Sequence, residues 1–174
     1  WITNYPGKAV IRAVSCAGTS VQVIKEKKTV TVVGSQDGSL TVNVSESGAL
    51  QSTVQKAIGT SEITVLKVKT SNGVLLNDED ISYLRELNGL QKLDLFYAGC
   101  SGLDLSGNTS LTSVILPKSL EEIQPCAFKD CKGLKSIEIP ASVDRIAANA
   151  FVNCTALPDS IKVWGVEPPQ ITGT

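Results

Sequence analysis

A repeat with a constant offset of 23 residues is the feature that most limits how this chain can fold. Residues 111–131 and 134–154 align at this offset without a gap. The matched positions are Leu111 with Leu134, Leu116-Pro117 with Ile139-Pro140, Ser119 with Ser142, Ile123 with Ile146, Ala127-Phe128 with Ala150-Phe151, and Cys131 with Cys154. Such a period is typical of proteins that stack one small structural unit on the next, because a single unit cannot bury its own apolar edge.

Looser copies of the repeat extend it in both directions. They are Ile63-x-x-Leu66-x-Val68, Leu90-x-x-Leu93-x-Leu95 and Ile161-x-Val163. The pattern therefore predicts about five coils, each beginning with a short strand whose alternate side chains point inward. Residues 93–111 hold two Leu-x-Leu half-turns, which predict a variant coil with Cys100 and Leu103 facing inward.

Two helices are expected before the regular repeats. Residues 48–58 carry apolar side chains four apart, and Gly59 follows where a C-terminal cap belongs. Within residues 78–87, Ile81, Leu84 and Leu87 lie on one face of the expected helix, and Asn77 can cap its acidic first turn. We expect these helices to form an N-terminal cap, residues 46–88, on a repeat domain spanning 46–174.

Residues 1–45 have a different pattern from the repeats. Short β-rich runs at 9–14, 21–25, 29–33 and 40–44 are separated by Gly, Ser and Asp. We interpret this segment as a small β unit that precedes the repeat domain. At the other end, Pro168-Pro169 and Gly173 stop the repeats, and a closing strand is expected within 160–174.

The two aligned copies resemble the BspA-like leucine-rich repeats, which occur mostly in secreted or surface proteins of anaerobic bacteria and in some protozoa. The string LxxVxLPxSLxxIxxxAFxxCxxL at 111–134, and its near copy at 134–157, carry the resemblance. It covers roughly residues 48–171 and says little about 1–45. It implies an α/β repeat fold, a right-handed leucine-rich-repeat solenoid with a parallel strand face. It also implies an extracellular or bacterial cell-surface location, a role in adhesion, and no catalytic residues.

The composition argues against an enzyme. With no histidine in the chain, a Ser-His-Asp or Cys-His arrangement and a HExxH metal helix are impossible. The carboxylates at 78–80 and 121–122 are interpreted as helix-dipole partners or a solvated face. We therefore predict a non-catalytic protein with no cofactor and no metal.

Net charge argues against a nucleic-acid partner, and the lengths of the apolar runs argue against a membrane span. The net charge is -1, from 16 basic and 17 acidic residues, which does not suit a nucleic-acid surface. No stretch approaches the ~18 apolar residues of a membrane span. Because the sequence does not begin with Met, the chain is expected to be a mature product, a trimmed chain or a fragment.

The cysteines leave two interpretations open. Cys131 and Cys154 occupy the same repeat position, so they should stack as small buried apolar residues or form a disulfide. Cys126 breaks the repeat, since its counterpart is Asn149, and it is expected to be more exposed.

The outward side of the strand face is the candidate binding surface. If the leucine positions point inward, the residues between them form two outward rows. The first row is Lys67, Asp94, Ile115, Glu138 and Lys162, and the second is Lys69, Phe96, Pro117, Pro140 and Trp164. A solvated sheet with cross-strand charge pairs accounts for the first row.

Two aromatic residues favour a binding role for this face. Exposed Phe96 and Trp164 are typical of interface anchors, although Trp164 could instead fold onto Pro168-Pro169 as an end cap. The favoured partner is a host or bacterial surface protein. The alternatives are a glycan or cell-wall ligand, and a spacer that presents a neighbouring domain.

Overall fold

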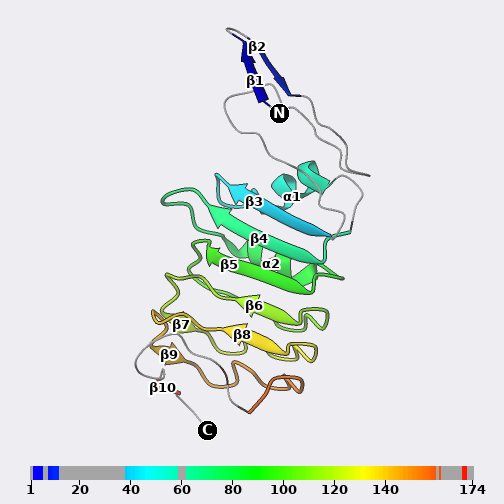
Figure 1. Ribbon diagram of the computed structural model, residues 1–174. Helices are drawn as coiled ribbons and strands as arrows, with labels where there is room; N and C mark the ends of the chain where they lie inside the picture. Colours follow the sequence, from blue (N-terminus) through cyan, green and yellow to red (C-terminus); the bar gives the residue numbers. More distant parts are fainter. Residues whose placement is uncertain are drawn as a thin grey trace.

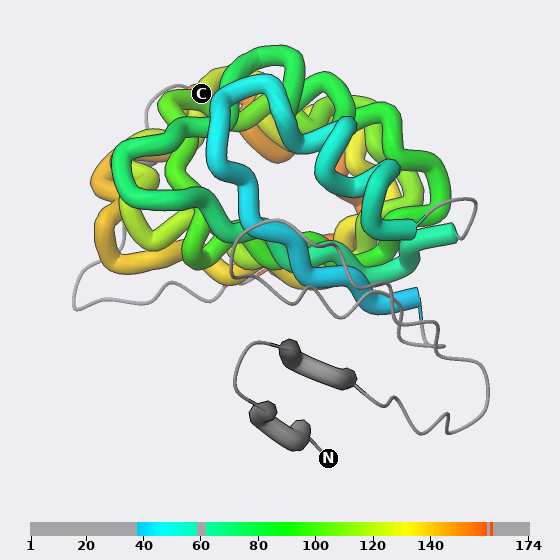
Figure 2. The backbone as a smooth tube through the Cα atoms, turned by 90° about the horizontal axis from the view of Figure 1, so that it is seen from above, coloured from blue at the N-terminus to red at the C-terminus, as the bar shows by residue number. Residues whose placement is uncertain are grey.

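A parallel sheet of five strands forms one side of the molecule (Figure 1). The computed structural model describes residues 2–5, 8–11, 38–58, 62–159, 161 and 170–171. In order across the sheet the strands are β3 (Ser39–Val44), β4 (Val65–Thr70), β5 (Lys92–Tyr97), β6 (Ser113–Ile115) and β8 (Ser136–Glu138). Seen from above, the chain follows nearly the same path coil after coil (Figure 2). The predicted α/β repeat with a parallel strand face is confirmed.

The strand register puts the repeat's apolar positions in the core. Leu66, Leu93, Val114 and Ile137 are successive partners across β4, β5, β6 and β8. These four side chains, and the apolar ones two residues further along, are almost completely buried. Since strand side chains alternate between the two faces, the intervening residues point outward. The predicted inward rows are confirmed for these four strands, whereas Val163 lies outside the described residues; Cys100 and Leu103 are buried as expected.

A second parallel sheet lies elsewhere in the coils and was not predicted. It consists of β7 (Glu122–Ile123), β9 (Arg145–Ile146) and β10 (Gln170–Ile171), in the order β10-β9-β7. Strands of two residues have no alternation that a sequence pattern could show. β10 falls within the range expected for the closing strand but pairs with β9. The strand expected at 161–163 lies mostly outside the described residues.

The two predicted helices are present and connect the first strands of the main sheet. α1 (Leu50–Ile58) joins β3 to β4, and α2 (Asp78–Glu86) joins β4 to β5. The sequence pattern placed 40–44 in the N-terminal β segment, but β3 pairs along its length with β4. The five-stranded sheet therefore begins with β3, which forms its N-terminal edge. Gly59 lies outside the part of the chain that the structure describes.

The buried carboxylate of Asp80 links the start of α2 to the start of α1 by hydrogen bonds. Asn77 caps α2, as predicted, and Asp80 completes a capping box with it. Asp80 is 1% exposed and also accepts hydrogen bonds from the backbone N–H groups of Gly48 (2.8 Å) and Leu50 (2.9 Å) at the start of α1. These bonds satisfy donors that a helix N-terminus leaves without partners.

A short antiparallel pair is described near the N-terminus. β1 (Ile2–Tyr5) pairs with β2 (Lys8–Ile11). The β-rich runs at 21–25 and 29–33 lie outside the described residues, so a separate β unit before β3 stays a prediction.

The exact repeat has a structural cause in the loops opposite the main sheet. Phe128 is fully buried and stacks on Phe151, its counterpart one coil later, with ring centroids 5.3 Å apart. The N–H of Phe128 donates to the carbonyl of Ala150 (2.8 Å), and that of Leu105 donates to the carbonyl of Ala127 (2.8 Å). The same loop thus recurs with the same contacts in successive coils, which accounts for the constant offset of 23 residues.

Candidate functional site

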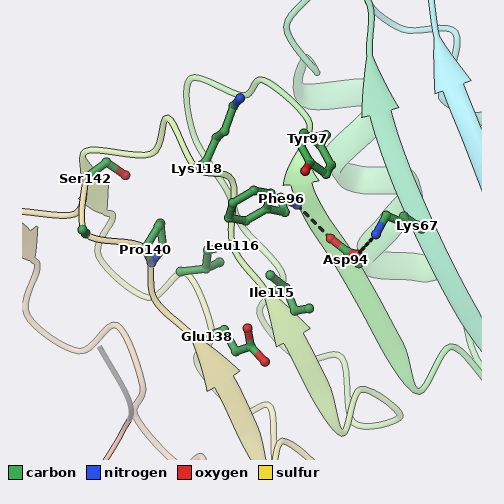
Figure 3. A pocket seen from close by; sticks show the side chains of 11 residues that line it. Lys67, Asp94, Phe96, Tyr97, Ile115, Leu116, Lys118, Glu138, Pro140 and Ser142 are labelled. Atoms are coloured by element: carbon green, nitrogen blue, oxygen red, sulfur yellow. Dashed lines mark hydrogen bonds and ion pairs between the residues drawn. The ribbon is translucent and has the colours of Figure 1, made fainter. Parts of the chain in front are cut away.

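A hollow of about 560 Å³ lies on the outward side of β5, β6 and β8 (Figure 3). Five of the seven predicted surface residues line it, namely Lys67, Asp94, Phe96, Ile115 and Glu138. Lys162 and Trp164 lie outside the described residues. Tyr97, Leu116, Lys118 and the turn at 140–142 complete the lining.

The middle outward row is aligned as the sequence predicted. Lys67, Asp94, Ile115 and Glu138 are register partners across four strands. Lys67 Nζ lies 2.6 Å from Asp94 Oδ2, and this hydrogen bond raises the pKa of the Lys67 ammonium. The other oxygen of Asp94 accepts from the Phe96 N–H at 3.0 Å. Both oxygens of Asp94 are thus engaged within the protein.

The second outward row is not aligned as predicted, because β5 contains a bulge. The register shifts after Lys67, so that Lys69 lies opposite Tyr97 and not opposite Phe96. A bulge adds one residue to a strand and redirects the side chains beside it. Phe96 and Tyr97 are consequently both exposed, at 37% and 51%. Pro117 and Pro140, predicted to point outward, are buried.

Tyr97 is a site residue that sequence reasoning missed. Its ring packs edge-on against Phe96, with centroids 4.9 Å apart and planes at 85°. Three ammonium groups lie over it: those of Lys67 at 5.9 Å, Lys69 at 5.7 Å and Lys118 at 5.4 Å from the ring centroid. Strict alternation would have placed one of two adjacent aromatic residues inward. Only the bulge exposes both.

A second hollow, of about 460 Å³, adjoins the first and shares Tyr97 and Lys118 with it. Lys69 and the loop from Thr70 to Leu75 form much of its lining, and Leu75 is 48% exposed. None of the residues that line this hollow is acidic. The two hollows therefore differ in character on either side of one aromatic ring.

Comparison with protein families assigns the repeats. Residues 105–163, about a third of the chain, match the family model described as BspA type leucine rich repeat region (6 copies). Residues 105–163 are thus repeats of the BspA leucine-rich type. A search of curated proteins found no match.

This family places the chain in a broad functional class. BspA-type leucine-rich repeats indicate a protein-binding repeat module, are typically non-catalytic, and are associated with bacterial surfaces. Across the residues that the structure describes, no helix is both long enough and apolar enough to cross a membrane. The same residues contain no group of three side chains suited to hold a metal ion.

Two cysteines of the BspA-type repeats donate hydrogen bonds to backbone carbonyl groups. Cys131 Sγ donates to the carbonyl of Leu105 (3.1 Å), and Cys154 Sγ donates to that of Phe128 (2.9 Å). Cys100, Cys126, Cys131 and Cys154 are free thiols. Burial raises the pKa of Cys100 and of Cys131 to about 11. The disulfide between Cys131 and Cys154 is therefore not formed; Cys131 is buried as the other interpretation predicted, and Cys154 is half-buried.

Proposed function

We propose that this chain is a non-catalytic module that binds a protein partner through the outward side of its five-stranded sheet. The coils would form a right-handed leucine-rich-repeat solenoid of about five coils. By analogy with the family, the module would be secreted or lie on a bacterial cell surface and serve in adhesion.

The observation that carries this proposal is the pair of exposed aromatic rings beside a hollow. Most of the outward row is charged and solvated, and its ion pair at Lys67 and Asp94 adds little to stability. Phe96 and Tyr97 have no such explanation, because exposing two large rings is unfavourable in the free protein. Aromatic side chains at a concave, partly apolar surface are typical anchors of protein interfaces.

The test is a capture experiment that depends on these rings. The immobilised chain would be exposed to extracts of host extracellular matrix and of bacterial surfaces, and retained proteins would be identified. The affinity of each would then be measured for the Phe96→Ala and Tyr97→Ala variants, with Gln51→Ala on the exposed side of α1 as the control. We expect at least a tenfold loss for the two aromatic variants only. Equal affinity for all three variants would contradict the proposal.

Carbohydrate binding is the second candidate. Sugar rings stack on exposed aromatic faces, and Tyr97 is 51% exposed. A glycan array would decide, since a blank array at high protein concentration would dismiss this candidate. A spacer role is the third, and it predicts that neither substitution changes any binding.

A further inference from the structure

The two hollows that meet at Tyr97 offer different chemistry to a ligand. The first is apolar over much of its surface, with Phe96, Ile115, Leu116 and Pro140 among its lining residues (Figure 3). The polar groups nearest its aromatic wall already bind one another, because Asp94 accepts from both Lys67 and the Phe96 N–H. This hollow therefore favours an apolar side chain over a hydroxyl-rich ligand such as a sugar.

The second hollow is lined by two lysines and by no acidic residue. Lys69 and Lys118 line it and approach the Tyr97 ring to 5.7 Å and 5.4 Å. Neither lysine forms an ion pair with any residue in the described part of the chain, whereas Lys67 is paired with Asp94 at 2.6 Å. Two ammonium groups without an ion-pair partner among the described residues thus lie near one ring, on a chain whose net charge is -1. Charge complementarity at such a place selects an acidic group.

We propose that the two hollows together bind an extended, acidic peptide segment of the protein partner. This inference rests on the proposed protein-binding function and specifies its ligand. A bulky apolar side chain of the segment occupies the hollow beside Phe96, and a carboxylate lies between Lys69 and Lys118. Both ammonium groups lie within 6 Å of the ring that divides the hollows. An extended chain advances about 3.3 Å per residue, so the two side chains are separated by about one to three positions.

The probe is a phage-displayed library of random dodecapeptides panned on the full chain. Peptides that are enriched would be synthesised and their affinities measured for three proteins: the unmodified chain, Phe96→Ala, and the double variant Lys69→Glu with Lys118→Glu. The matched control is Lys56→Glu with Lys129→Glu, which changes the net charge equally at exposed positions outside both hollows.

The inference predicts one consensus and one pattern of losses. Enriched peptides should carry Asp or Glu within three positions of Phe, Tyr, Trp or Leu. Their affinity should fall about tenfold or more for the Lys69 and Lys118 double variant, and should also fall for Phe96→Ala, but not for the control pair. Raising the salt concentration should weaken binding to the unmodified chain and leave the residual binding to the double variant nearly unchanged.

Other outcomes would distinguish a failure of the acidic-peptide inference from a failure of the proposed protein-binding function. Peptides that require Phe96 but lack an acidic consensus, and that tolerate both charge reversals, would overturn the acidic-segment inference alone. An empty panning, or binders indifferent to Phe96 and to both lysines, would overturn the proposed function as well. If sulfated or sialylated glycans on an array bound in a manner dependent on Lys69 and Lys118, while no peptide did, the basic hollow would be a glycan site and not a peptide site.

Discussion

Replacing Asp80 with alanine should destabilise this protein more than any other loss of a single acidic side chain in α2. The carboxylate is 1% exposed and accepts from the N–H groups of Gly48 at 2.8 Å, Leu50 at 2.9 Å and Asn77 at 3.2 Å. It thereby joins residues that are 30 or more positions apart in the sequence. Loss of Asp80 would release the start of α1 from the start of α2.

The expected size of the effect follows from these three bonds. A hydrogen bond to a charged group contributes about 1.5–3 kcal/mol, and a buried donor left without a partner costs about 1–3 kcal/mol. Water can reach the N–H of exposed Asn77, but Leu50 is fully buried. We therefore expect Asp80→Ala to lower the free energy of unfolding by about 3–5 kcal/mol, a large part of a typical domain's stability. Asp80→Asn keeps one acceptor oxygen and should lose about half as much.

Urea unfolding followed by circular dichroism measures this difference directly. Asp78→Ala is the matched control, because Asp78 is an exposed acidic residue in the same first turn of α2. Its removal should cost only the helix-dipole contribution of about 0.3–1 kcal/mol. If Asp80→Ala cost no more than Asp78→Ala, the buried link between the helices would be refuted.

Three further predictions concern the repeat loops. Cys126→Asn should stabilise the protein by about 0.5–1 kcal/mol, because Cys126 has φ 60 and its counterpart, Asn149 with φ 61, is a residue type that tolerates this conformation; an unchanged melting temperature would count against it. Gly133→Ala should destabilise by about 1–3 kcal/mol in urea unfolding, because a Cβ there would overlap the carbonyl oxygen of Thr109, and a neutral result would show that the loop relaxes. N-ethylmaleimide at pH 8, read out by peptide mapping, should label Cys126 long before Cys131, whose pKa of about 11 leaves about one thiol in a thousand as the reactive thiolate; equal labelling rates would contradict the burial of Cys131.

The sequence predicted the parts of the fold that depend on periodicity. Leucine positions spaced two apart define the inward face of β4, β5, β6 and β8, and the observed registers follow them. α2 was predictable because Asn77 and the acidic residues after it form an N-terminal signal, and α1 because its apolar residues are spaced four apart. The placement of 40–44 differed because β3 has no Leu-x-x-Leu-x-Leu motif of its own, and its place was fixed only by pairing with β4.

The candidate site was predictable only in part. Lys67, Asp94, Ile115 and Glu138 share one row because strand alternation is regular up to that point. The bulge in β5 is a local departure from that alternation, and no residue type in the segment predicts it. It exposes Tyr97 and creates the basic hollow beside Lys69, which no count of alternating residues could have located.

The central claim, that a protein partner occupies the outward face around Phe96 and Tyr97, is tested most directly by site-specific photo-crosslinking. A photoreactive phenylalanine analogue would replace Tyr97 in one protein and Gln55, on the exposed side of α1, in another. Both would be irradiated with the captured partner. We expect a crosslinked complex from position 97 and none from position 55. Crosslinking from position 55 alone, or from both positions equally, would contradict it.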